Sequence, residues 1–462
     1  MVIMNTEENQ QNSSFPVTHT LFASFEPWCD SLAGQLRSQP QGSEDIEEQV
    51  SHILAQVKTG GDDAVQEFSQ RFDGIPQADS RVSLDEPDEA IARLSREQPD
   101  LYEAITIAEE NITRFHRQQQ WQSYSTLLCH QEIVCQRLVR PIETVGLYVP
   151  GGEAPLVSSL MMMAIPAKLA RVEHIVLCTP PVAPGKIHPL IRDVASLFAI
   201  NEVHAIGGAQ AIAAMAYGTN RVTSVDKIFG PGNRWVMAAK QQVAVKTVTG
   251  IDMPAGPSEV MVVADHEARP EFVAADLLAQ AEHGIDSQVI CIFIGTKNQL
   301  SDFSTALNHH MNQQLAKLSR RKVIQQAISC YGRYIHVNDQ NNDQVLAIIN
   351  QYAPEHLILQ VAESHEYLPH IKHAGSIFCG HFTPESFGDY ASGTNHVLPT
   401  GGYARITGGL TVESFQKTMT VQAFRPQPNS ELAKVTQILA AVEGFDAHKQ
   451  AVAIRMASLA DE

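Results

Sequence analysis

The spacing of hydrophobic and polar residues divides the chain into regions of different structure. Between residues 15 and 119 the apolar positions recur as expected for amphipathic helices, for example over 46–59 and 87–95. After Pro141, short β-rich runs are separated by helix-length segments. These runs cover residues 145–149, 174–178, 203–206, 227–229, 259–263, 289–294, 331–337, 356–360 and 375–379. Strands that alternate with helices in this way predict an α/β protein whose parallel sheets are covered on both faces, and the runs suffice for two sheets.

The two ends of the chain differ from this α/β part. Residues 1–14 are polar, and we predict that they are disordered. Residues 430–462 return to a helical pattern, in which Gly444 separates two stretches.

The charge balance excludes some classes of partner. Asp and Glu number 51 against 33 Lys and Arg, which gives the 462-residue chain a formal net charge of -18. Such a surface repels a nucleic acid or an anionic membrane unless basic residues are concentrated locally, and the densest basic run is only Arg320, Arg321 and Lys322. We therefore expect neither a nucleic-acid nor a membrane partner.

Cysteine usage and the apolar segments indicate a compartment. The seven cysteines are scattered without a CxxC pair, so neither a disulfide framework nor a zinc ribbon is expected. Residues 1–14 lack the apolar segment of a signal peptide, and the most apolar stretch, 156–170, is interrupted by Ser, Pro and Lys and is too short to span a bilayer. These features predict a protein of the reducing cytoplasm.

Three glycine-rich segments follow predicted strands and precede helical stretches, at residues 148–152, 207–210 and 229–233. None has the GxGxxG spacing of the standard dinucleotide-binding loop. A helix N-terminus with small residues still offers free N–H groups to a pyrophosphate. Three such segments at the carboxyl edge of one sheet favour nucleotide binding. Ordinary βα turns without a ligand remain the alternative.

A possible metal site begins in the segment 270–284, which predicts a helix between Pro270 and Gly284. Gln280 and His283 lie three residues apart, so that an oxygen and a nitrogen can point at one place. A surface histidine is the simpler explanation for this pair taken alone. The second candidate is the segment 384–396, whose Gly and Ser content predicts a long irregular loop of the kind that is usually functional.

Two further acid and histidine pairs stand out. Glu355 and His356 lie at the start of a predicted strand, where neighbouring side chains point in opposite directions unless the backbone bends at Pro354. Glu443 and His448 flank a turn between the two C-terminal helical stretches. A solvated helix hairpin explains this second pair as well as a site does.

Seven sequence strings occur in a characteristic order and spacing: VGLYVPGGEAPL, GGAQAIAA, VDKIFGPGN, IDMPAGPSE, QAEHG, PEHL and ESFGDYASGTNHVLPTGG. Together they closely resemble the histidinol dehydrogenase family, and the match is dense from about residue 141 to 420. The resemblance implies a zinc- and NAD-dependent enzyme that oxidises L-histidinol, through the aldehyde, to L-histidine.

The resemblance also assigns roles to individual residues. The implied zinc ligands are Gln280, His283, Asp389 and His448, and the implied catalytic pair is Glu355 and His356. NAD contacts match Tyr148, Gln210 and Asn233. Histidinol contacts match Ser258, Gln280, His283, His356, Asp389, His396, Glu443 and His448.

Members of the family are homodimers in which the C-terminal Glu and His complete the neighbouring subunit's site. The implied fold has two incomplete Rossmann-like domains with small helical segments at both ends, arranged as a domain-swapped homodimer. On this basis we expect an N-terminal helical segment at 15–44 and a C-terminal helical tail at 403–462 that reaches the partner. The first α/β domain would combine 45–147 with 257–350, and the second, which binds NAD, would combine 148–256 with 351–402.

The chemistry of the expected reaction suggests a division of labour. His356 would accept the hydroxyl proton, and Glu355 would activate water for the aldehyde step. A rival mechanism uses Cys178 or Cys379 as a covalent nucleophile. A non-catalytic histidinol-binding protein and a zinc hydrolase are alternatives from other classes, although the second lacks an HExxH arrangement and leaves the glycine segments without a role.

Overall fold

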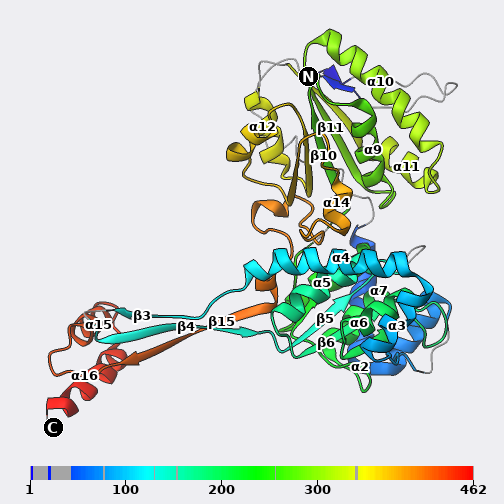
Figure 1. The fold of residues 1–462 in the computed structure, drawn as a ribbon. Helices are drawn as coiled ribbons and strands as arrows, with labels where there is room; N and C mark the ends of the chain where they lie inside the picture. The colour runs from blue at the N-terminus through cyan, green and yellow to red at the C-terminus, as the bar shows by residue number, and fades with distance from the viewer. Residues whose placement is uncertain are drawn as a thin grey trace.

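The computed structural model describes residues 2–3, 19–21, 43–75, 79–128, 131–151, 155–254, 256–338 and 342–460. Figure 1 shows two α/β bodies and an arm that leaves one of them. Among the described residues, no helix is long and apolar enough to cross a membrane.

The first body is built on a five-stranded parallel sheet with the strand order β7-β6-β5-β8-β9. Its strands are β5 (Thr144–Tyr148), β6 (His174–Thr179), β7 (Glu202–Ala205), β8 (Lys227–Phe229) and β9 (Gly250–Ile251). The order reverses between β5 and β8, so the crevice beyond their carboxyl ends is where a parallel sheet of this kind takes its ligand.

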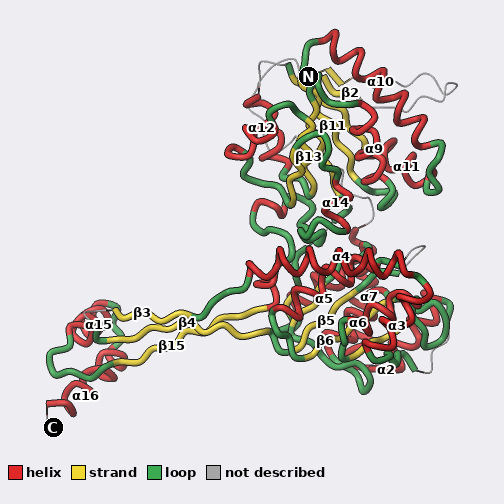
Figure 2. Tube along the Cα trace, in the orientation of Figure 1, coloured by secondary structure: helices red, strands yellow, loops and turns green. Residues whose placement is uncertain are grey.

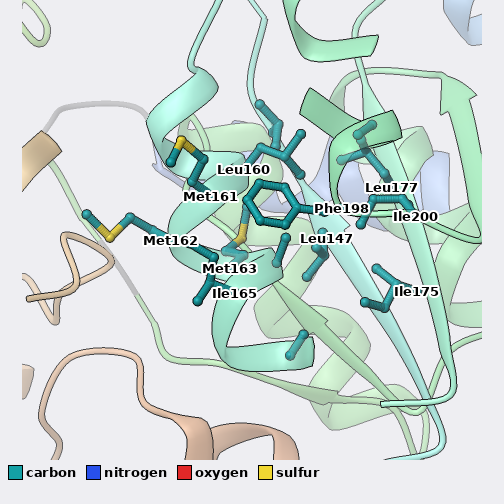
Figure 3. Close-up of a cluster of buried hydrophobic side chains, with 14 of the residues drawn as sticks. Leu147, Leu160, Met161, Met162, Met163, Ile165, Ile175, Leu177, Phe198 and Ile200 are labelled. Atoms are coloured by element: carbon teal, nitrogen blue, oxygen red, sulfur yellow. The ribbon is translucent and has the colours of Figure 1, made fainter. Parts of the chain in front are cut away.

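Helices cover both faces of this sheet because successive strand residues point to opposite sides. Leu147 and Leu177 pack toward α4 (Pro99–His116), α5 (Val157–Leu169) and α6 (Pro189–Leu197), and Figure 3 shows this cluster around Phe198. Val176 and Cys178 pack on the other face toward α2 (Ser43–Asp73), α7 (Gly208–Tyr217) and α8 (Arg234–Lys246). The helix α3 (Pro87–Glu97) lies beside α4 and α6.

The second body is built on a seven-stranded sheet with the order β1-β2-β12-β11-β10-β13-β14. All its neighbours pair in parallel except β1 and β2. The strands are β1 (Val2–Ile3), β2 (His19–Leu21), β10 (Glu259–Ala264), β11 (Gln288–Ile294), β12 (Gly332–Val337), β13 (His356–Gln360) and β14 (Ser376–Cys379).

Its helices also divide between the two faces. Val260 and Val262 pack toward α9 (Pro270–Ala281), α10 (Lys297–Leu315) and α11 (Arg321–Tyr331), whereas Met261 and Val263 pack toward α12 (Asn342–Tyr352) and α13 (Ser364–Tyr367). The short helix α14 (Glu385–Tyr390) follows β14.

A C-terminal arm projects from the first body, as Figure 2 shows. Its stem is an antiparallel sheet of β3 (Tyr124–Leu128), β4 (Ile133–Pro141) and β15 (Gln416–Phe424), in the order β15-β4-β3. Its tip consists of α15 (Glu431–Val442) and α16 (Asp446–Ala460). Large apolar side chains on the arm are exposed in the single chain, including Leu128, Met419, Ile438, Val442 and Phe445.

The sheets correct the expected division into domains. The strands at 356–360 and 376–379 pair with β10 and β13, so this part of the segment 351–402 belongs with 257–350 and not with 148–256. The helices α2, α3 and α4, from the segment 45–147, pack on the five-stranded sheet instead.

The chain ends also differ from the expectation. The expected tail 403–462 is not purely helical, because β15 forms the stem of the arm. In the segment 1–14 the structure describes only the strand Val2–Ile3. In the segment 15–44 it describes the strand His19–Leu21 and the beginning of α2. The rest of both segments lies outside the described residues.

Candidate functional site

A bend in the backbone brings Glu355 and His356 to the same side. Ala353 has a left-handed backbone with φ 52°, and β13 begins only at His356. The backbone N–H of Glu259, at the start of β10, donates to Glu355 Oε2 at 2.9 Å, and that oxygen lies 3.8 Å from His356 Nδ1. The bend that the sequence made possible at Pro354 is therefore present, one residue earlier, at Ala353.

The surroundings of His356 determine which ring nitrogen can take a proton. Its Nδ1 lies 3.1 Å from the carbonyl oxygen of Glu259, and because a carbonyl only accepts, Nδ1 carries the hydrogen. Its Nε2 is buried, has no hydrogen-bond partner among the residues that the structure describes, and keeps a lone pair. Burial lowers the pKa of His356 to about 3, so the ring is neutral at physiological pH.

Candidate metal-ligating groups lie beside the His356 ring. The ligand atoms of His283, Glu385 and Asp389 all lie within 4.8 Å of one another. Asp389 Oδ1 is 3.8 Å from His356 Nε2. Gln280, on α9, is 0% exposed, and neither atom of its amide has a hydrogen-bond partner among the described residues.

These groups fit a divalent cation. Burial raises the pKa of Glu385 well above its ordinary value, with the nearby Asp389 adding to the effect, and burial raises the pKa of Asp389 to about 7. Leaving a buried amide unpaired is costly, and crowding buried carboxyl groups is costly too. A cation held between them relieves both costs, since it accepts the amide oxygen and favours the charged carboxylate.

His396 lies at the edge of the same group. Its Nδ1 is 2.7 Å from the carbonyl oxygen of Asp389, and its Nε2 is 3.2 Å from Ser159 Oγ on α5. The first contact makes Nδ1 the donor, so Nε2 accepts from the Ser159 hydroxyl. His396 therefore ties the metal-side loop to the five-stranded sheet's helices.

The three glycine segments lie at the carboxyl edge of the five-stranded sheet, as the sequence predicted. Tyr148 ends β5, and its hydroxyl oxygen accepts from the backbone N–H of Gly208 at 3.0 Å. Gln210, on α7, is buried, and within the described part of the chain its Oε1 has no hydrogen-bond partner. Asn233 caps α8, where its Oδ1 accepts from the N–H groups of Trp235 and Val236 at 3.1 and 3.2 Å.

A cavity of about 100 Å³ joins the two sides of the site. The 230–232 turn lines it from the first sheet, Ser258 and Glu355 line it from the second body, and His396, which contacts both bodies, lines it as well. The first sheet contributes its carboxyl edge, whereas Ser258 and Glu355 lie at the amino ends of β10 and β13.

The single chain does not bring all the expected site residues together. Glu443 and His448 lie at the tip of the arm, far from the other candidates in Figure 1, and both are exposed. All the other candidates lie in the two bodies.

Sequence reasoning missed Glu385, which offers a buried carboxylate beside Asp389. Its only signal was its place in the segment 384–396. That segment was expected to be irregular throughout, but it begins with the helix α14, capped by Pro384.

The two cysteines of the rival mechanism occupy apolar surroundings. Cys178 is fully buried in β6 among the α2, α7 and α8 contacts, and burial raises the pKa of its thiol above its usual range. Burial raises the pKa of Cys379 as well. A thiol held protonated in this way is a poor nucleophile.

The sequence is similar to those of known proteins. The family model described as histidinol dehydrogenase matches residues 36–456. The chain belongs to the histidinol dehydrogenase family. A histidinol dehydrogenase of Xylella fastidiosa is 46% identical over 411 residues, which cover 89% of this chain and 93% of that protein. One from Haemophilus influenzae is 46% identical over 424 residues, which cover 92% and 95%.

A solved structure agrees with this assignment. The crystal structure of histidinol dehydrogenase from Elizabethkingia anophelis superposes with a TM-score of 0.85 at 41% identity, covering 96% of this chain and 98% of that one. The family resemblance and the α/β fold with two Rossmann-like bodies are thereby confirmed. Histidinol dehydrogenases are NAD-dependent oxidoreductases of histidine biosynthesis, so the chain is an enzyme of this class.

Proposed function

We propose that the chain oxidises L-histidinol to L-histidine in two NAD-dependent steps, as a zinc-dependent homodimer of the cytoplasm. The observation that carries the proposal is the free Nε2 of His356, which faces a group of metal-ligating side chains across from the glycine segments. A proton acceptor, a metal position and a nucleotide position are what this oxidation needs.

Gln280, His283 and Asp389 would hold zinc from one subunit, and the partner's arm would add His448. The unpaired amide of Gln280 and the crowding of Asp389 with Glu385 support this assignment. Zinc bound by these residues would supply a fixed positive charge that orients the substrate and Lewis-acid assistance to the oxidation.

In the first step His356 Nε2 accepts the hydroxyl proton of histidinol while the carbinol hydrogen leaves as hydride to NAD. The products are the aldehyde, a protonated His356 and NADH. The hydrogen bond from Nδ1 to the Glu259 carbonyl fixes the ring for this transfer. Ser258, His396 and the partner's Glu443 would contact the substrate, and Tyr148, Gln210 and Asn233 would contact NAD.

In the second step water adds to the aldehyde, and the hydrate loses a second hydride to a second NAD. Glu355 would take the proton from the attacking water, and its place on the wall of the cavity supports this role. As the hydrate forms, protonated His356 would return its proton to the aldehyde oxygen, and the imidazole, neutral again, would accept a proton of the hydrate during the second hydride transfer. The same imidazole would thus serve both oxidations.

The assay that tests the proposal follows NADH absorbance after purified protein is mixed with NAD and L-histidinol. We expect two NADH for each histidinol, loss of activity after chelator treatment, and recovery with Zn²⁺. A folded, zinc-loaded protein that binds histidinol without forming NADH would instead be a non-catalytic binding protein on this scaffold.

A further inference from the structure

A buried ion pair lies behind the 230–232 turn. Lys240, on α8, and Asp252, which follows β9, form a salt bridge between Nζ and Oδ1, and both side chains are 1% exposed. Taking two charges out of water is costly, and a buried pair seldom adds net stability over apolar side chains of the same size. The pair therefore calls for an explanation other than stability.

Both partners hold the same residue of the turn. Lys240 Nζ donates to the carbonyl oxygen of Gly230 at 2.8 Å, and the N–H of Gly230 donates to Asp252 Oδ2 at 2.8 Å. The ion pair thus satisfies the backbone donor and the backbone acceptor of one glycine. Asp252 Oδ1 also accepts from the N–H of Met253 at 2.7 Å.

Gly230 needs such support because of its conformation. Its φ is 124°, and a Cβ at this position would lie 2.1 Å from the carbonyl oxygen of Tyr148. The ends of β5 and β8 therefore approach each other closely at the point where the strand order reverses. A turn that only glycine can form, at a ligand-binding crevice, is held in one shape by the ion pair.

The pair also lines the cavity shared with the catalytic residues. Lys240, Asp252 and the 230–232 turn form one wall, and Glu355 and His396 lie on the others. A shift of this turn changes the distance between anything bound on the first sheet and the groups of the second body.

We propose that Lys240 and Asp252 are a positioning pair, which holds the 230–232 turn in the shape that sets the nicotinamide of NAD against Glu355 and His356. This inference rests on the proposed NAD-dependent reaction. In this role neither Lys240 nor Asp252 is a ligand of the metal or of histidinol. Replacing either residue therefore affects the binding and placement of NAD alone.

The test replaces Lys240 with methionine, which keeps the length of the side chain and removes its donors. We expect Lys240→Met to lower kcat/KM for NAD roughly 10- to 100-fold, because small displacements of a reacting group cost that much. The affinity for NADH, measured by its fluorescence, should fall, whereas zinc content and the affinity for histidinol, measured by calorimetry, should stay at the wild-type level. Asp252→Asn keeps the size and one acceptor oxygen, so its effect should be smaller and in the same direction.

Lys246→Met is the matched control. Lys246 lies at the other end of α8, where its Nζ donates to Ser51 Oγ at 2.9 Å. It should leave the NADH affinity and the KM for NAD unchanged.

Several outcomes overturn the inference. One is a folded Lys240→Met protein with wild-type NADH affinity and kcat, and another is an equal loss of NADH affinity and histidinol affinity. If Lys240→Met does not fold, Asp252→Asn decides by the same measurements. If neither folds, the pair is a requirement of folding and the positioning role is refuted. Absence of NADH formation in the wild-type protein refutes the proposed reaction instead, which the variants do not affect.

Discussion

Glu355 and His356 are neighbours in the sequence, and burial disfavours the charged form of both. It raises the pKa of the Glu355 carboxyl well above its ordinary value and lowers the pKa of His356 to about 3. The His356 imidazole is thus a neutral proton acceptor in a dry environment. In such an environment a nearby cation has a large effect on the pKa of a carboxyl group. Different tasks for the two residues follow from their different contacts.

Replacing Glu355 should separate the two oxidation steps. Glu355→Gln keeps an oxygen to accept the N–H of Glu259 but removes the base. We expect aldehyde oxidation to fall roughly 10²- to 10⁴-fold, the usual contribution of a general base, with a much smaller loss in alcohol oxidation. Single-turnover NADH formation from histidinol and from its aldehyde measures the two steps. His356→Gln should slow both, and equal losses in Glu355→Gln contradict the division of labour.

Gln280 offers a test that separates stability from metal binding. Its amide is fully buried without a partner, so Gln280→Leu should raise the free energy of unfolding of the metal-free protein by about 1 kcal/mol and lower its zinc content after reloading. Calorimetry and metal analysis give the two values.

The control for this prediction is Gln360, another buried glutamine. Its amide donates to Asp276 at 2.6 Å, and therefore Gln360→Leu should destabilise the protein. Destabilisation by Gln280→Leu as well would mean that the Gln280 amide has a partner in the folded protein and is not kept for a metal.

At the scale of elements, the turn before β14 supports the turn before β13. The N–H of Gly375 donates to the Pro354 carbonyl and that of Ser376 to the Glu355 carbonyl, at 2.9 and 2.8 Å. A Cβ on Gly375 would lie 2.6 Å from the carbonyl oxygen of Glu355. The position of Glu355, the base proposed for the aldehyde step, thus depends on a glycine that is 20 residues away from it.

Gly375→Ala should therefore impair catalysis without removing any functional group. The added methyl displaces Glu355, and we expect kcat to fall roughly 10- to 100-fold, with a loss of about 1–3 kcal/mol in stability. Gly408→Ala is the control, since a Cβ there has nothing within 4 Å. Wild-type kcat in a folded Gly375→Ala protein would show that the turn yields without moving Glu355.

The elements also show what the sequence could and could not predict. The strands at 227–229 and 356–360 were predicted at their observed bounds, because they are short apolar runs between helical stretches. The stem strands β4 and β15 were not predicted, although β15 alternates polar residues with Met419, Val421 and Ala423, and in the single chain neither face of β15 is buried. Spacing alone could not assign Gln280 or His283, since their site is assembled from α9, α14 and the β13 bend.

At the scale of the whole molecule, the arm carries two of the expected site residues away from the body that needs them. Glu443 and His448 lie beyond the stem, and the arm exposes apolar side chains such as Val442 and Phe445 that a partner subunit would cover. Both observations favour the exchange of arms between two copies of the chain.

Mixing two inactive variants tests this exchange. His448→Ala lacks an arm ligand and Glu355→Gln lacks a body residue, so each homodimer should oxidise histidinol to histidine poorly. After subunits redistribute at random, each mixed dimer has one intact site and one doubly defective site. About a quarter of the wild-type activity should return. No recovery after verified subunit exchange would mean that each chain completes its own site.

The length of the stem follows from the pairing of its strands. β15 and β4 pair over nine residues of β15, from Gln416↔Pro141 to Phe424↔Ile133, which spans about 30 Å at the rise of a β-strand. If His448 acts on a neighbouring subunit, the length of the stem determines how far from its own α/β bodies His448 can lie. Adding one residue to both strands would turn the helical tip of the arm to the opposite face of the sheet. Adding two residues would move the tip about 7 Å farther from the body. If the arm completes a partner's site, the length of this antiparallel ladder is therefore constrained.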